Sequence, residues 1–184
     1  MKKENRFLNA IKWWLKSFLW VAPLIFIIDQ VTKLLVYYNN TNVTVIPNFF
    51  SIKLSWNLGA AWSLFEEHPA ILAIISVVGT IGFITYLVLK YKTISFRYRM
   101  SILLMLAGCA GNMVDRVMQV FPNNIHSGKG VIDFLAFRLF DAYNFPVFNV
   151  ADMSLVIGVF LLMLFMILDE VRQKNEPENK SDNA

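Results

Sequence analysis

The sequence is poor in the residues that most catalytic sites use. It has one cysteine and two histidines in 184 residues. It shows no Ser–His or Cys–His pairing, no cluster of metal ligands and no phosphate-binding loop. The lone Cys109 has no partner for an internal disulfide, and we interpret it as a small packed side chain in a helical run. These absences argue against nucleophilic, metal-dependent and nucleotide-dependent chemistry. We therefore expect no metal and no cofactor, and carboxylates remain as the acid and base.

Charge is also scarce. Charged residues make up 16% of the chain, hydrophobic residues 57%, and the mean hydropathy is +0.51, a composition that excludes an ordinary soluble domain. A membrane span needs roughly 20 apolar residues in a helix. Four runs meet this length, at approximately 18–38, 70–89, 100–120 and 147–168. We predict one polytopic membrane domain over residues 1–168 and a polar, disordered cytoplasmic tail over 169–184.

The first run is not a cleaved signal peptide, because it is too long, contains Asp29 and Lys33 and lacks an A-x-A site. Residues 1–17 combine lysines with tryptophans, which is typical of a segment at the membrane interface. The formal net charge of +4 comes from basic residues before the first run, between the second and third runs, and after the fourth. By the positive-inside rule both termini are cytoplasmic. We do not interpret this charge as a nucleic-acid signal.

The first outer loop predicts a small β element. Residues 42–46 and 51–56 alternate with a period of two, and Pro47 and Asn48 mark a turn between them. Gly59 and Ala60 follow, and permit close backbone approach. In the second outer loop, residues 119–129 are rich in turn formers, and His126 there is expected to be a solvated loop histidine. The apolar spacing in 131–142 favours a short helix on the membrane surface. The predicted fold class is an all-α membrane protein with four transmembrane helices, a small extracytoplasmic β element and this surface helix.

Three groups of polar residues interrupt the spans. Asp29 and Lys33 are four residues apart, so they form an internal ion pair, a functional site, or both. Asn112, Asp115 and Arg116 share one helical face. An Asp–Arg contact with the arginine snorkelling outward accounts for two of them but leaves Asn112 unexplained. Helix capping alone accounts for Asn149 and Asp152, as N-cap and third helical residue.

The predicted topology gathers these groups. The carboxylates of Asp29, Asp115, Asp133 and Asp152 all fall at the outer leaflet boundary, together with three asparagine amides: Asn57, Asn112 and Asn149. Independent ion pairs would not be expected to lie at one depth in the membrane, whereas the residues of a single site would. Two neighbouring carboxylates share one proton and can act together as acid and base on an amide bond. A proton-coupled transporter is the alternative, but it predicts acidic groups through the whole membrane depth. A non-catalytic scaffold is the third possibility.

Five sequence blocks, in order from residue 18 to residue 168, carry a family resemblance: D-Q-V-T-K at 29–33, N-L-G-A-A-W at 57–62, G-N-M-V-D-R at 111–116, V-I-D-F at 131–134 and F-N-V-A-D at 148–152. Together they resemble bacterial lipoprotein signal peptidase, also called signal peptidase II. The resemblance implies an intramembrane aspartyl endopeptidase of the bacterial cytoplasmic membrane. Its substrates would be diacylglyceryl-modified prolipoproteins, cut immediately before the lipidated cysteine.

The resemblance also implies roles for individual residues. Asp133 and Asp152 would be the catalytic pair. Other residues would bind substrate or support the site: Asn57, Gly59, Ala60, Asn112, Arg116 and Asn149 near the substrate, and Asp29, Lys33 and Asp115 in the framework. The loop strands would form a cradle over the substrate. The implied partners are prolipoproteins and membrane lipid, with no nucleic acid, and we expect a monomer.

The chain departs from the family pattern just before Asp133. The family joins its D-R and V-x-D-F blocks by a short segment, whereas Asp115 and Asp133 are 18 residues apart here. We assign the extra residues to 119–129. Lys129 stands where the family has a glycine, and Gly128 and Gly130 flank it. The expected consequence is a different local loop geometry.

Overall fold

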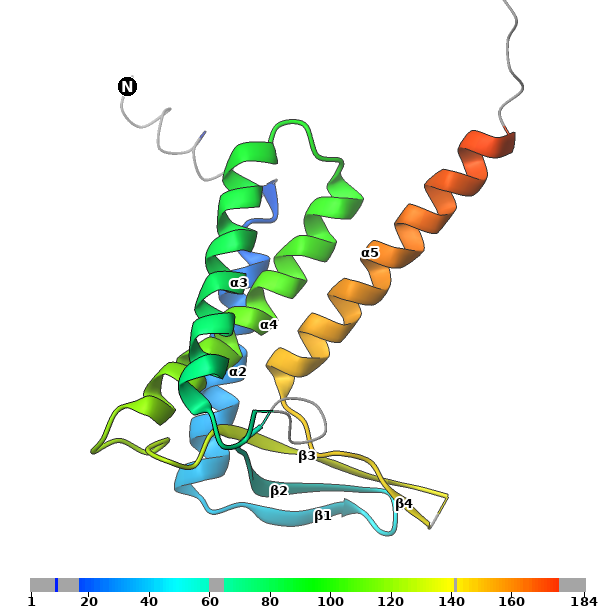
Figure 1. Ribbon diagram of the computed structural model, residues 1–184. Coiled ribbons are helices and arrows are strands. Elements are labelled where there is room, and N and C mark those ends of the chain that lie inside the picture. The colour runs from blue at the N-terminus through cyan, green and yellow to red at the C-terminus, as the bar shows by residue number, and fades with distance from the viewer. Residues whose placement is uncertain (1–8, 10–16, 60–64, 141, 176–184) are drawn as a thin grey trace, which may run out of the picture.

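The computed structural model describes residues 9, 17–59, 65–140 and 142–175 (Figure 1). Within these residues four helices are long and apolar enough to cross a membrane: α2 (Val21–Tyr38), α3 (Pro69–Lys90), α4 (Phe96–Val120) and α5 (Val150–Asn175). They correspond to the four predicted spans, with ends shifted by a few residues. Most of the predicted interfacial segment 1–17 lies outside the described residues. The chain is a multi-pass membrane protein.

Helix α4 is the central helix, and it packs against α2, α3 and α5. Small residues allow its close approach to α5, as the sequence predicts. A Cβ added at Gly108 would lie 2.8 Å from the Leu155 Cβ, and one added at Gly111 would lie 2.9 Å from the Ala151 Cβ. Cys109 is half-buried and faces Gly79 of α3. The outward surfaces of the helices are apolar, which suits contact with lipid: Val88 and Leu89 are 74% and 73% exposed.

A four-stranded antiparallel sheet lies at one end of the helices, with the order β1-β2-β3-β4. Its strands are β1 (Asn42–Ile46), β2 (Phe50–Asn57), β3 (Val131–Leu139) and β4 (Tyr143–Asn144). In Figure 1 the sheet extends sideways beyond the ends of the helices. The predicted β element of the first outer loop is confirmed as β1 and β2. A tight turn at 47–49 joins them, with Asn48 at a φ of 58°.

The predicted surface helix over 131–142 is wrong, because Val131–Leu139 is strand β3. Strand β3 pairs with β2 in an antiparallel register in which Ser55 faces Asp133 and Asn57 faces Val131. Residues 131–134 are all buried, Asp133 among them, so this part of the strand is covered on both faces and lacks the alternating pattern of a half-buried strand. The partner strand lies far earlier in the sequence, so local spacing did not reveal it. The predicted loop over 119–129 is confirmed from residue 121 onward.

Helix α5 continues to Asn175, well past the predicted end at residue 168. The prediction of a disordered tail is therefore wrong for residues 169–175. Asp169 joins this extension to the start of α4, because its carboxylate accepts hydrogen bonds from Arg97 (2.9 Å) and Tyr98 (2.7 Å). Residues 176–184 lie outside the described part of the chain.

Candidate functional site

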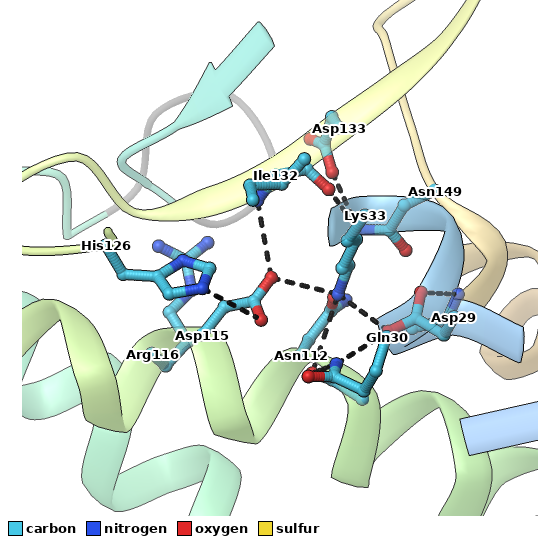
Figure 2. A network of polar contacts seen from close by, with 12 residues as sticks. Asp29, Gln30, Lys33, Asn112, Asp115, Arg116, His126, Ile132, Asp133 and Asn149 are labelled. Carbon is cyan, nitrogen blue, oxygen red and sulfur yellow. Dashed lines mark hydrogen bonds and ion pairs between the residues drawn. The ribbon is translucent and has the colours of Figure 1, made fainter. Parts of the chain in front are cut away.

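The polar residues of the spans meet at the sheet end of the helices, in one network (Figure 2). Asp29 and Lys33 come from α2, and Asn112 and Asp115 from α4. Asp133 comes from β3, and Asn149 and Asp152 from the start of α5. The convergence of four carboxylates predicted from the sequence is thus confirmed as a contact network among all seven of these residues and Asn57 of β2.

Lys33 lies at the centre of a buried ion triad with Asp29 and Asp115. Its Nζ atom is 2.8 Å from the Asp29 carboxylate and 2.9 Å from the Asp115 carboxylate, and all three side chains are at most 2% exposed. Lys33 also donates to the Asn112 Oδ1 at 3.0 Å. A buried charge is stable only when it is paired and hydrogen-bonded. The ion-pair interpretation of Asp29 and Lys33 is confirmed, and the hydrogen bond from Lys33 to Asn112 joins the triad to the rest of the polar network.

The two acids of the triad also hold the backbone. The Asp29 Oδ1 accepts a hydrogen bond from the Ala151 N–H at 2.8 Å. The Asp115 Oδ2 accepts one from the Ile132 N–H at 3.3 Å. Ala151 and Ile132 directly precede Asp152 and Asp133. The triad therefore joins α2 and α4 to the two backbone segments that carry these aspartates.

Amide groups connect Asp133 and Asp152. The Asn149 Nδ2 donates to the Asp133 Oδ1 at 2.7 Å, and the Asn149 N–H donates to the Asp152 Oδ2 at 3.0 Å. The Asp152 N–H donates in return to the Asn149 Oδ1 at 2.9 Å. This reciprocal pair is a capping box at the start of α5. The capping interpretation of Asn149 and Asp152 is correct, but it omits the bond to Asp133.

Each aspartate has one further amide donor. The Asn57 Nδ2 donates to the Asp133 Oδ2 at 3.0 Å, and the Asn112 Nδ2 donates to the Asp152 Oδ1 at 2.7 Å. All four carboxylate oxygens of Asp133 and Asp152 are therefore hydrogen-bonded. This explains Asn112, which the Asp–Arg interpretation left without a role.

The surroundings of Asp133 favour its protonated form. Burial removes water from the carboxyl, and the charge of Asp152 adds repulsion, so the pKa of Asp133 rises from 3.8 to about 7. The hydrogen bonds from Asn57 and Asn149 and the charge of Lys33 oppose this rise only in part. Asp133 can therefore bind or release a proton near neutral pH.

Arg116 does not snorkel outward, so the alternative interpretation as an outward-pointing Asp–Arg contact is wrong. It is buried, and its guanidinium donates to the carbonyl oxygens of Asn57 (3.1 Å), Leu58 (2.9 Å) and Gly59. Three successive carbonyls at the end of β2 satisfy the buried guanidinium inside the protein. Arg116 thus holds the segment that carries Asn57, and Gly59 contributes its carbonyl. Ala60 lies outside the described residues.

Sequence reasoning missed two side chains of the network. The Gln30 Nε2 donates to the Asp29 Oδ2 and the Gly111 carbonyl, both at 3.1 Å; its place beside Asp29 was the available signal. His126 was predicted to be solvated, which is wrong, because it is 6% exposed and contacts Asp115. No local signal indicates that its loop folds inward. Within the described residues no three His, Cys, Asp or Glu side chains are placed to hold a metal ion.

A peptide bond that lies between the carboxyls of Asp133 and Asp152 can exchange protons with both of them. One carboxyl of a pair that shares a proton can accept a proton from water, and the other can donate to a carbonyl oxygen.

Comparison with known proteins identifies the family. Residues 21–168 match the family model described as signal peptidase (SPase) II. The chain belongs to this family. The lipoprotein signal peptidase of Listeria monocytogenes is 35% identical over 150 residues, which cover 80% of this chain and 90% of that protein. The lipoprotein signal peptidase of Staphylococcus carnosus is 32% identical over 159 residues, covering 85% and 93%.

Solved structures agree. A bacterial membrane enzyme determined by the in meso method at 2.3 Å resolution has a TM-score of 0.70 and 30% identity, and the match covers 92% of this chain and 93% of that one. A second, at 1.9 Å resolution, has a TM-score of 0.66 and 32% identity, covering 82% and 92%. As a family member, the chain is an aspartic peptidase that cleaves the signal peptides of prolipoproteins. Family membership decides in favour of the peptidase over the transporter and the scaffold.

Proposed function

We propose that Asp133 and Asp152 are the catalytic pair of this peptidase. The observation that carries the proposal is the double contact of Asn149, whose side chain binds Asp133 while its backbone binds Asp152. The pKa of Asp133, raised to about 7 by burial and by the Asp152 charge, supports a pair that holds one proton near neutral pH.

In the proposed reaction a water molecule lies between the pair and the scissile peptide bond. The ionised carboxyl takes a proton from the water as its oxygen attacks the carbonyl carbon. The protonated carboxyl donates its proton to the carbonyl oxygen, which gives a neutral tetrahedral diol. The carboxyl that gained a proton then gives it to the leaving nitrogen and the C–N bond breaks. The other carboxyl takes a proton from a hydroxyl of the diol as the carbonyl re-forms, so the pair again holds one proton.

The surrounding residues position the pair and the substrate. Asn57, Asn112 and Asn149 orient the carboxyl oxygens through their amides. Arg116 holds the carbonyls of residues 57–59 and so the segment that carries Asn57. Asp29, Lys33 and Asp115 form the framework, since their triad holds the backbone next to both aspartates. Preorganised donors of this kind avoid rearrangement during the reaction.

The proposed substrates are prolipoproteins with a diacylglyceryl-modified cysteine, cut immediately before that cysteine. The site would lie at the outer leaflet of the bacterial cytoplasmic membrane, with both termini in the cytoplasm and the sheet as an extracytoplasmic cradle over the substrate. Basic residues of the loop between α3 and α4 and of the end of α5 support this orientation. We propose that the enzyme acts as a monomer in contact with membrane lipid.

Replacement of either aspartate tests the catalytic pair. Asp133→Asn and Asp152→Asn each keep a polar side chain of the same size but cannot exchange the proton. We expect the purified variants to stay folded and to lose prolipoprotein cleavage by at least about 10²-fold, because general acid–base catalysis contributes roughly 10²–10⁴-fold for one group. Cleavage would be measured with a lipidated and an unlipidated prolipoprotein, and only the lipidated one should be cut by the parent enzyme.

Asp169→Asn is the matched control, because Asp169 lies at the opposite end of α5 and contacts Arg97 and Tyr98. It should cleave at the parent rate. Undiminished cleavage by a folded Asp133→Asn or Asp152→Asn protein would refute the catalytic pair.

A further inference from the structure

The loop between α4 and β3 encloses a buried histidine. The Asn124 side chain ties the loop to the end of α4, since its Nδ2 donates to the carbonyls of Met118 (2.9 Å) and Phe121 (2.7 Å). The Asn124 Oδ1 accepts the His126 N–H at 2.9 Å, and the Lys129 N–H donates to the His126 carbonyl at 2.8 Å. This turn directs the imidazole toward α4, where it is 6% exposed (Figure 2).

Both ring nitrogens of His126 face hydrogen-bond acceptors. The Nδ1 atom is 3.1 Å from the Gly130 carbonyl oxygen. The Nε2 atom is 3.8 Å from the Asp115 Oδ1. That oxygen is buried and has no hydrogen-bond partner among the described residues. The other oxygen of the same carboxylate is the one that binds Lys33 and the Ile132 N–H.

Two acceptors restrict where the imidazole can carry its protons. A neutral imidazole has one N–H, and the Gly130 carbonyl requires it on Nδ1 because a carbonyl only accepts. The lone pair of Nε2 then faces the Asp115 carboxylate, which is unfavourable. Only the imidazolium has a donor for both neighbours, and it also brings positive charge to the free carboxylate oxygen.

We propose that His126 is a positioning residue for Asp133, and that it positions best as the imidazolium. His126 contacts the Gly130 carbonyl and the Asp115 carboxylate, and that carboxylate accepts the Ile132 N–H. These two contacts therefore lie on either side of Val131 at the start of β3. Protonated His126 holds this start against α4 and so fixes Asp133, two residues further on. The proposal rests on the assignment of Asp133 to the catalytic pair.

Other charged groups lie around His126, on its own loop and on the elements packed against it. Asp115 faces it from α4, and Lys33 of α2 and the Ile132 N–H compete for that carboxylate. Arg116, the residue after Asp115 on α4, binds carbonyls of residues 57–59. From its own loop, Lys129 lies over the Trp56 ring at 5.4 Å, and that ring packs against His126 at 5.9 Å. Strand β3 contributes the carboxyl of Asp133.

Cleavage kinetics between pH 5.5 and 8.5 test the proposal. His126→Asn keeps an amide N–H for the Gly130 carbonyl but loses the second donor. Where ¹⁵N NMR shows His126 of the parent protonated on both nitrogens, we expect the kcat of the variant to be roughly 3- to 10-fold below that of the parent, the size of effect that one hydrogen bond has, with KM unchanged. The ratio of parent to variant kcat should be closer to 1 where the spectrum shows the neutral form. His126→Ala should be slower than His126→Asn at every pH.

His68→Asn is the matched control, because His68 is the other histidine of the chain and is exposed; it should behave as the parent does. A folded His126→Asn enzyme whose kcat ratio equals 1, or is the same for both protonation states of the parent's His126, would overturn the proposal. Asp133→Asn in the same assay tests the catalytic pair separately, since its loss of cleavage does not depend on His126.

A spectroscopic measurement on the parent enzyme needs no altered residue near the site. With ¹⁵N-labelled histidine, the two imidazoles give a simple nitrogen spectrum, which His68→Asn assigns. The expected neutral form of His126 at high pH carries its proton on Nδ1, and the low-pH form carries protons on both nitrogens. A neutral form protonated on Nε2 would overturn the proposal even if the kinetics changed.

Discussion

Asn149 shows how one residue can serve the backbone and the proposed catalytic pair together. Its N–H and Oδ1 close the capping box with Asp152, and its Nδ2 reaches Asp133. Since the capping box fixes the side-chain rotamer of Asn149, the first turn of α5 also fixes the donor to Asp133. Asn149 is therefore both the capping residue of α5 and a residue of the candidate site. The sequence pattern alone could not separate these two roles.

The raised pKa of Asp133 predicts how stability depends on pH. Burial lifts this pKa from 3.8 in the unfolded chain to about 7 in the folded protein. The folded state therefore binds the proton more tightly, and the stability due to this proton is complete below about pH 4 and is lost as the pH rises to 7. We expect the unfolding free energy of the parent, relative to Asp133→Asn, to fall between these pH values and to be constant above about 8.

Thermal and denaturant unfolding in detergent would measure this difference at each pH. Glu67→Gln, which removes an exposed carboxylate, should leave the pH dependence of the parent unchanged. A difference between the parent and Asp133→Asn that does not vary with pH would contradict the raised pKa.

At the scale of elements, the site depends on how β3 joins β2. Asn57 and Val131 are register partners at the end of this ladder. Gly130, immediately before β3, lies against the backbone there: a Cβ added to it would meet the Asn57 carbonyl oxygen and lie 3.0 Å from the Leu58 Cα. Gly130, the residue after Lys129, therefore makes the close backbone approach in this chain.

Two neighbouring glycines provide a matched pair of variants. Gly128 and Gly130 both have positive φ, 68° and 89°, but only at Gly130 would a Cβ meet neighbouring atoms within 4 Å. Gly128→Ala carries the backbone cost alone, about 1–2 kcal/mol. Gly130→Ala carries the same cost and also displaces the segment that holds Asn57. We expect a loss of kcat of at least about tenfold for Gly130→Ala and little change for Gly128→Ala.

Cleavage rates and thermal unfolding of both purified variants would check this. Equal kcat values for the two variants would show that the approach of Gly130 to Asn57 does not position the site.

At the scale of the whole molecule, the polar network lies at one end of an apolar helix bundle. Carboxylates and Lys33 are buried where α2 and α4 end and α5 begins, next to the sheet (Figure 1). The outward faces of the helices carry exposed apolar side chains. With the proposed catalytic pair, a peptide bond that reaches this end would be cut without a charged group lying deep in lipid.

Labelling of single cysteines tests the proposed orientation. In a Cys109→Ala background, Asn48→Cys lies in the exposed β1–β2 turn and Lys92→Cys in the exposed loop between α3 and α4. A membrane-impermeant maleimide applied to intact spheroplasts should label Asn48→Cys at once, and Lys92→Cys only after the membrane is opened. The reverse labelling pattern would contradict the positive-inside assignment.

Several features of the site could be predicted from the sequence, and others could not. The gathering of Asp29, Asp115, Asp133 and Asp152 followed from placing the four spans in a membrane. The role of Arg116 did not, because its carbonyl partners are at residues 57–59, up to 59 positions away. The burial of His126 did not either, because it depends on how its loop folds onto α4.

By itself the sequence determined the four spans, the first two strands and the capping of α5, because apolar runs, alternation and capping residues act within a few positions of one another. Only the tertiary structure decided that residues 131–139 form a strand, that Asp115 holds the Ile132 N–H, and that Asp29 holds the Ala151 N–H. The last bond joins residues 122 positions apart. Contacts of this kind form because buried backbone and charge must find partners in the folded chain, and no local pattern specifies which partners those are.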